Sequence, residues 1–497
     1  MVRLSKSKVM SALQCPKRLH LEVHRPELAQ HSPKTEAIFA TGHAVGALAR
    51  ELLGAEDGVF IDRAWGMDAA LDKTAELMSQ GVSAIYEAAF LHDGVLVYID
   101  VLRREGEAWR IIEVKSSTSL KDEHLRDCAV QAWVFQGAGH SFSGVSVAHV
   151  DTSFAYPGGG DYRGLLTEVD ATEDATALLG SVPGWVAKAH EATASEDLDT
   201  QVGEHCSKPH DCPFDDHCWP NHTTYPVRRL GGRKKKLASF ANKGYADIRE
   251  VPLIELTSAK HKWIHRVTKA GEPDLREDAI RFARGLEYPR YYLDFETIGP
   301  AIPVWPGTRP YRALPFQWSC HIEDAPGSLH HTEFLEISPE PTMRNLAEAM
   351  LDTLGQAGPI LMYSSYEKTV IKNLTKFFPD LAPSLQALIE RLVDLKKIAE
   401  NNYYHPAMLG SWSIKAVLPT VAPDIDYGQL EEVQNGTAAS NAYIEAIDSV
   451  TDEVRREFLR ERMLEYCRLD SEAMVRVLHF FASGGETAPI EVASLPA

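Results

Sequence analysis

The sequence YYLDFET occupies residues 291–297 and places two carboxylates inside a bulky, apolar run. Tyrosine, leucine and phenylalanine favour strands, so we expect a buried strand over 288–298. Side chains at positions i and i+2 of a strand lie on one face, so Asp294 and Glu296 should point to the same side. Because acidic residues are depleted in strands, the pair favours a cation site over an ordinary solvated sheet face.

Later segments supply the further acids that such a site needs. In EYCRLDSEAM (465–474), Tyr466 and Asp470 are four residues apart and would share one helical face. In ILMYSSYEKTVIKNL (360–374), Glu367 lies where a strand leads into a helix. Four acids from three elements could bind two Mg²⁺ or Mn²⁺ ions for phosphodiester cleavage, while Tyr466 orients water.

The first part of the chain alternates helical and strand patterns. Apolar periodicity predicts helices over 33–53 and 122–139, and strands over 94–100 and 108–116. This alternation predicts an α/β domain, so the chain as a whole is expected to be an α/β multidomain protein.

A second group of catalytic candidates lies on these elements. Asp100 ends the first expected strand, and Glu113 and Lys115 lie two residues apart on the next, sharing a face. Two carboxylates with a lysine suit metal-assisted phosphodiester cleavage, with Asp100 and Glu113 as ligands of Mg²⁺ or Mn²⁺. An ordinary solvated sheet face is the alternative. Two further candidates are Glu87, in IYEAAF, and Gln131, on the following helix.

Four of the seven cysteines form a spacing pattern of their own. Cys206, Cys212 and Cys218 are separated by five residues each, and Cys15 lies far upstream before a proline. These gaps are not those of a zinc ribbon, and soft thiolates suit a 4Fe-4S cluster. Zinc is the alternative metal, with extra ligands available from His205, His210, His217 or His222. The remaining cysteines, expected to be core residues, are Cys128, Cys320 and Cys467.

Composition sets the broad class. The chain has 497 residues, 44% of them hydrophobic, and a net charge of −19. No apolar run is long enough to cross a membrane and no signal peptide is read, so we expect a cytoplasmic protein. Acidic nucleases bind phosphates partly through cations, so this charge does not exclude a nucleic acid partner. The clearest basic run is Arg228–Lys236.

The first group of residues resembles the RecB-type PD-(D/E)XK nucleases. Asp100, Glu113, Lys115 and Gln131 match the family's pattern, whereas its helical tyrosine is Phe135 here. The histidine usual on the first helix is also absent from its place. We interpret the nearby His43 as a core residue. The cysteines resemble the iron–sulfur clasp of AddB and of CRISPR-adaptation nucleases, which pins the N-terminal segment to the far end of the domain.

The second group resembles the DEDD exonucleases of the RNase H fold. Asp294, Glu296 and Asp470 match that pattern, and Glu367 replaces the aspartate of the second motif. The resemblance also implies two reserve candidates: Asp394 matches an accessory strand position as a reserve ligand, and His405 would be the base in the histidine-type branch, which Tyr466 argues against. The whole layout resembles a bacterial family of predicted RecB-type nucleases with a C-terminal domain of formerly unknown function.

These resemblances imply a metal-dependent nuclease, a DNA exonuclease acting on ends or single strands, with two hydrolytic sites. The alternative is a nucleic-acid-binding scaffold or a redox-sensing iron–sulfur protein with one decayed nuclease site. The expected parts are a RecB-like domain with the cysteine clasp (1–222), a basic helical linker (223–285), an RNase H-like domain (286–482) and a flexible tail (483–497).

Overall fold

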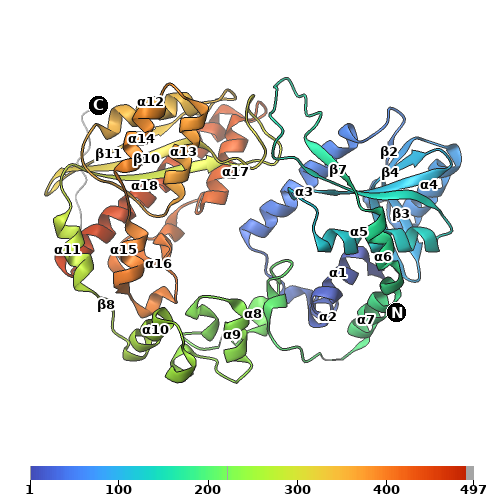
Figure 1. The fold of residues 1–497 in the computed structure, drawn as a ribbon, viewed down its shortest axis with the longest axis horizontal. Helices are drawn as coiled ribbons and strands as arrows, with labels where there is room; N and C mark the ends of the chain where they lie inside the picture. The colour runs from blue at the N-terminus through green and yellow to red at the C-terminus, as the bar shows by residue number, and fades with distance from the viewer. Residues whose placement is uncertain (1, 197, 221, 488–497) are drawn as a thin grey trace. The chain divides into compact units, whose positions relative to one another are not determined.

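The computed structural model describes residues 2–196, 198–220 and 222–487, and it shows a mixed α/β protein (Figure 1). The chain divides into two compact units. The first unit is Met1–Pro220 with Pro300–Tyr311, and the second is Asn221–Gly299 with Arg312–Ala497. Within the described part of the chain, every helix is too short or too polar to span a bilayer.

The first unit is built on a seven-stranded sheet with the order β2-β3-β4-β5-β6-β7, in which β1 pairs with β4. The pairs β3–β4, β4–β5 and β6–β7 are antiparallel, whereas β5–β6 is parallel. Its strands are β1 (Leu4–Ser5), β2 (Val59–Phe60), β3 (Ala84–His92), β4 (Val95–Glu105), β5 (Ala108–Lys115), β6 (Phe142–Val150) and β7 (Leu166–Asp170).

Two helices of the first unit follow a serine whose side chain caps the first turn. The Ser32 hydroxyl, for example, accepts the Thr35 N–H ahead of Pro33, the first residue of α3. The helices are α1 (Lys6–Gln14), α2 (Pro16–His24), α3 (Pro33–Leu52), α4 (Met67–Gln80), α5 (Asp122–Gly137), α6 (Thr172–Leu178), α7 (Val182–Ala194) and α8 (Asp215–Cys218). The expected core position of Cys128 on α5 is confirmed, because this residue is fully buried in the apolar cluster against the sheet.

Two local expectations are wrong. The strand expected over 94–100 runs on to Glu105, so Asp100 lies inside β4 and not at its end. The apolar residues Val101 and Leu102 continue the buried alternation beyond it. His43 is exposed on α3 and is not a core residue.

The second unit contains a five-stranded sheet with the order β11-β10-β9-β12-β13. The β9–β10 and β10–β11 pairs are antiparallel, and β9–β12 and β12–β13 are parallel. Counted in chain order, this is a 3-2-1-4-5 arrangement with β9 as the first strand. The strands of this unit are β8 (Asp274–Leu275), β9 (Arg290–Ile298), β10 (Leu314–Ala325), β11 (Ser328–Leu335), β12 (Ile360–Met362), β13 (Leu392–Asp394) and β14 (Tyr403–Tyr404).

The long helix α18 packs against β9 and β10. It begins after Asp452, whose carboxylate accepts the Arg455 N–H, and ends before the left-handed Gly484. The helices of this unit are α9 (Lys234–Ala241), α10 (Ala259–Ala270), α11 (Glu277–Gly285), α12 (Met343–Leu354), α13 (Tyr366–Phe377), α14 (Ala382–Glu390), α15 (Leu395–Asn402), α16 (Ile414–Val421), α17 (Gly436–Ile447) and α18 (Glu453–Ser483).

The segment expected as a separate linker, 223–285, lies within the second unit. Its strand β8 pairs with β14, and its helix α11 packs against α18, where the Arg284 guanidinium donates to the Ala482 carbonyl at 2.8 Å. The segment also contributes buried apolar residues, among them Phe240, Trp263 and Ile264. The tail expected to begin at 483 lies mostly outside the described residues, in 488–497.

The segment 300–311 follows β9 in the chain but belongs to the first unit. Trp305 is fully buried, and Ala301 packs in an apolar cluster with Val45 and Val150. The backbone of Tyr156 also exchanges two hydrogen bonds with this segment, of 2.7 and 3.0 Å. The expected continuous domain over 286–482 is therefore interrupted by a short piece of the other unit.

Candidate active sites

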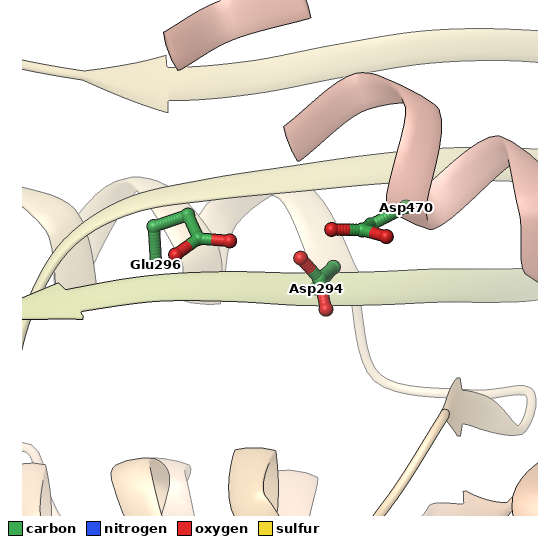
Figure 2. A group of neighbouring side chains, drawn as sticks. All are labelled: Asp294, Glu296 and Asp470. Atoms are coloured by element: carbon green, nitrogen blue, oxygen red, sulfur yellow. The ribbon is translucent and has the colours of Figure 1, made fainter. Parts of the chain in front are cut away.

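The acidic cluster of the second unit is built on β9 and α18. Asp294 and Glu296 lie on one face of β9, and Asp470 comes from α18, with the carboxylates turned toward the same space (Figure 2). Among the residues that the structure describes, these three form the one group of metal-ligand side chains whose ligating atoms all lie within 4.8 Å of one another. They line a cavity of about 410 Å³.

Electrostatics show that this cluster favours a positive partner. Burial, reinforced by the charge of Asp470, raises the pKa of Asp294 and of Glu296 well above the ordinary values. Burial also raises the pKa of Asp470. Three carboxylates this close together, with Glu296 and Asp470 buried and Asp294 half-buried, cannot all ionise cheaply without a cation. Oxygen ligands from carboxylates are the ones that Mg²⁺ and Mn²⁺ prefer, so the residues fit such an ion.

Glu367 lies where the sequence places it, in the first turn of α13, and it lines the same cavity. The Ser364 hydroxyl donates to its Oε2 at 3.3 Å. Burial raises the pKa of Glu367 to about 7. Glu367 does not belong to the tight group of three, although it lines the same cavity.

Tyr466 lies one helical turn before Asp470 on α18 and lines the cavity, as its spacing predicts. Two further residues were missed. The Tyr427 hydroxyl donates to Asp470 Oδ1 at 2.5 Å. The Lys415 ammonium lies 4.9 and 4.8 Å from the ring centres of Tyr427 and Tyr466. The neighbouring acids of the cluster attract this ammonium, although burial lowers its pKa. No spacing rule links these residues to β9, because tertiary packing alone brings them there.

The two reserve candidates do not line this cavity. Asp394 caps α15, where its carboxylate accepts the Lys397 N–H at 3.2 Å. His405 accepts the Ala407 N–H through Nδ1 at 3.1 Å and so caps a short turn. Both side chains therefore have local structural roles.

The candidate site of the first unit centres on Glu113, which is buried on β5. Its Oε1 accepts from Lys115 at 2.6 Å and from Lys6 at 2.8 Å, and its Oε2 accepts from Gln131 at 2.5 Å. Lys115 also bonds Asp127 at 2.6 Å. A cavity of about 840 Å³ is lined by both lysines and by Asp127.

Asp100 and Glu87 lie near this centre with different partners. The Asp100 Oδ2 accepts the Val114 N–H at 2.7 Å, and burial together with the charge of Glu113 raises the pKa of Asp100 to about 7. The Glu87 carboxylate pairs with the guanidinium of Arg63. The structure therefore brings Asp100, Glu113, Lys115 and Gln131 together. Glu87 instead forms an ion pair with Arg63.

Lys6 and Asp127 were not predicted for this site. Asp127 is four residues before Gln131 on α5, so helical spacing from Gln131 could have identified it. Lys6 is the first residue of α1, and no spacing in the sequence links it to Glu113. Burial raises the pKa of Glu113, but the two lysines outweigh it and hold that pKa well below its usual range. Because lysines and an amide already hold both Glu113 oxygens, the residues present do not form an open carboxylate pair for a cation.

The four cysteines of the expected cluster line one small cavity. Cys15 ends α1 and precedes α2, and the other three come from the 206–218 segment. The Gln14 amide donates to the carbonyls of His205 and His210, both at 2.7 Å, and so holds α1 against this segment. Gln14 was not predicted.

Ionisation of the thiols bears on metal binding. Burial raises the pKa of the Cys212 thiol to about 11 and also raises that of Cys218, so a bound metal would have to stabilise the thiolates. Four thiolates could ligate either a 4Fe-4S cluster or a zinc ion.

Comparison with known proteins gives limited matches. Residues 291–413 match the family described as "Domain of unknown function (DUF2779)", a stretch that begins in β9 and includes Glu367 but ends before Asp470. No curated protein matches the chain. Among solved structures, the chain is similar to "Crystal structure of SSO0001", at 13% identity and a TM-score of 0.22, over 43% of this chain and 84% of that one. The function therefore has to be argued from the sites.

Proposed function

We propose that the protein is a divalent-metal-dependent nuclease, an exonuclease acting on DNA ends or single strands, with its main hydrolytic site in the second unit. The observation that carries this proposal is the convergence of Asp294, Glu296 and Asp470 within 4.8 Å. Carboxylate groups gathered at this distance are the usual means of holding the cations of phosphodiester hydrolysis.

The topology around the cluster supports an RNase H-like fold. The 3-2-1-4-5 sheet places two acids on its first strand, and the third acid lies on a helix that packs against that strand. This is the placement that the resemblance to DEDD exonucleases implies. A register shift in β10 between Pro315 and Gln317, opposite Glu296, is consistent with a site here, because bulges are frequent beside active sites.

The side chains of the cavity have separable roles in this proposal. Asp294, Glu296 and Asp470 would hold Mg²⁺ or Mn²⁺, which when bound activates water and offsets charge on the leaving oxygen. Tyr427 fixes the orientation of Asp470 by its hydrogen bond. Tyr466 is placed to orient a water molecule. Lys415 is placed to meet a phosphate oxygen, since its ammonium faces the cavity beside the acids.

The test is cleavage of end-labelled single- and double-stranded DNA and RNA by the full chain with Mg²⁺ or Mn²⁺. The Asp294→Asn, Asp470→Asn double variant should lose exonuclease activity by orders of magnitude, because loss of ligands removes several kcal/mol of charge stabilisation. Asp352→Asn, at an exposed position on α12, is the matched control and should retain full activity. An active double variant would reject the site.

The first unit has two candidate roles. The resemblance to RecB-type nucleases proposes a second hydrolytic site at Asp100 and Glu113. The bonds from Lys6, Lys115 and Gln131 to Glu113 favour the second candidate, a nucleic-acid-binding unit whose nuclease site has decayed. Any cleavage that survives in the double variant above and disappears with Glu113→Gln would establish a second hydrolytic site. If the double variant cleaves no substrate, the nucleic-acid-binding role is the one that remains for the first unit.

The cysteine-lined cavity supports a further part of this proposal. We infer that Cys15, Cys206, Cys212 and Cys218 ligate a 4Fe-4S cluster that fastens the N-terminal segment of the first unit. The four thiols line one cavity, and the five-residue gaps between the last three cysteines differ from those of a zinc ribbon, which favours this cluster over a single zinc ion.

A further inference from the structure

A second cavity of the second unit lies apart from the acidic cluster. It has a volume of about 970 Å³ and is lined by residues of α10 and of the 249–253 segment, with Arg276. It shares no lining residue with the acidic cavity. Nothing in the proposed hydrolytic chemistry uses it.

The lining of this cavity is strongly basic in a chain whose net charge is −19. Five cationic side chains line it with one carboxylate, Glu250. The five are Arg249, Lys262, Arg266, Lys269 and Arg276.

Two of these arginines are partly neutralised, since Arg249 pairs with Asp247 at 2.9 Å and Arg266 pairs with Asp274. Lys262 and Lys269 are both exposed.

The exposed cations form a row along α10. Lys262, Arg266 and Lys269 are spaced by four and three residues, so they lie on one helical face. Seven residues of helix extend over roughly 10 Å, which is farther than one phosphate group can bridge. The row therefore suits a chain of phosphates better than a single anion.

Beside this row the cavity has an apolar floor. Val251, Pro252, Leu253 and Trp263 contribute to it, and Leu253 is 56% exposed. The next residue, Ile254, is 90% exposed. Two adjoining exposed apolar side chains beside a row of cations suit an interaction site.

The floor is held in position by polar contacts. The Trp263 indole N–H donates to Asp274 at 2.6 Å, and the Arg276 guanidinium lies 4.1 Å from the Trp263 ring centre. These contacts hold Trp263 of the apolar floor in position beside the cationic Arg276.

We propose that this basic cavity binds a segment of single-stranded nucleic acid, with successive phosphates on Lys262, Arg266 and Lys269 and a base against Leu253. Positively charged grooves that follow the phosphates are the general means of holding single strands without sequence preference, and the exposed Leu253 side chain offers an apolar surface against which a base can pack. A duplex would keep its bases stacked inside and would leave the apolar floor uncovered. The inference rests on the proposed function, because it supplies the strand that the acidic cluster would cleave.

The test is fluorescence anisotropy of a labelled oligothymidylate with the full chain in EDTA, so that binding is measured without cleavage. Lys262→Gln, Lys269→Gln should weaken binding at least tenfold and lower the slope of log Kd against log salt by about 1.4, since each single-strand phosphate contact contributes about 0.7. Lys188→Gln, Lys372→Gln is the matched control, because both lysines are exposed elsewhere. Thermal unfolding should show that both double variants fold.

The outcomes separate this inference from the proposed function. Unchanged Kd and salt slope in the Lys262, Lys269 variant would overturn the inference even if the chain cleaves DNA. Inorganic phosphate or a duplex that competes as well as the single strand would also overturn it. A chain that binds the oligonucleotide through these lysines but never cleaves any substrate would support the inference and reject the proposed function.

Discussion

At the scale of single residues, Glu367 shows how the candidate site makes the stability of the fold depend on pH. Its side chain is 4% exposed and faces the acidic cluster without belonging to its tight group. Burial raises its pKa from 4.5 to about 7, so the folded chain holds this proton more tightly than the unfolded chain does. Its contribution to stability is therefore complete below pH 4.5 and is lost as the pH rises toward 7.

We therefore expect the free energy of unfolding in EDTA to fall across this pH range, by on the order of 1 to 3 kcal/mol from this residue. Urea unfolding at a series of pH values measures the slope. Glu367→Gln should flatten it, because the amide does not titrate, whereas Glu340→Gln at an exposed position should not. Equal slopes in both variants would show that Glu367 does not titrate as described.

The residue scale also shows what the sequence could predict. Asp294 with Glu296, and Tyr466 with Asp470, were found because strand and helix periodicity place each pair on one face. Tyr427 was not found, since a turn far from β9 brings it to Asp470. Reading local spacing identifies pairs on one element and misses partners that packing supplies.

At the scale of elements, α1 and the 206–218 segment form the connection that the cysteine pattern implies. Gln14 donates to the carbonyls of His205, just before that segment, and of His210 within it, so hydrogen bonds connect α1 to this part of the chain. A bound cluster would add covalent ligation across a long loop, whose closure entropy grows only slowly with length. The clasp is thus expected to stabilise the first unit and not to take part in catalysis.

We predict that anaerobically purified protein contains iron and absorbs broadly in the visible range. Cys15→Ala and Cys206→Ala should each remove the iron and lower the unfolding temperature of the first unit, since a ligand is lost from the clasp. Cys320→Ala, at a buried position in the other unit, is the control and should keep its colour. Colourless protein with stoichiometric zinc would show that the cysteines bind zinc and not an iron–sulfur cluster.

The elements also show where sequence reasoning failed. The strands and helices around Asp100 and Glu113 were expected from apolar periodicity, although Asp100 proved to lie within β4. The basic residues of the segment 223–285 dominate its sequence pattern, and this pattern predicts a linker. Its attachment includes the two-residue strand β8, the helix α11 and the contacts of Trp263 with Tyr404 and Trp412, and neither so short a strand nor such tertiary contacts can be detected by periodicity.

At the scale of the whole molecule, the chain passes between the two units more than once. Residues 300–311 leave the second unit after β9 and return to it before β10. Their apolar side chains complete the first unit, where Trp305 is fully buried. Trp305→Ala should therefore destabilise the first unit by roughly 3–5 kcal/mol, the usual cost of truncating a buried tryptophan.

Hydrogen exchange measures this effect unit by unit. Loss of protection in β6 and β7 of the Trp305→Ala variant is expected, while Trp65→Ala, at a position 52% exposed, should leave protection close to that of the parent chain. Unchanged protection in the Trp305→Ala variant would show that this side chain of the 300–311 segment does not stabilise the first unit.

This crossing of the chain decides how the protein can be divided. A gene fragment that stops at Pro220 encodes the sheet of the first unit without Trp305. A protease nick after Pro220 would leave two fragments that stay associated, because the C-terminal fragment still supplies residues 300–311 to its neighbour. Functional complementation between separately expressed halves, and not independent domains, is what such a chain should yield.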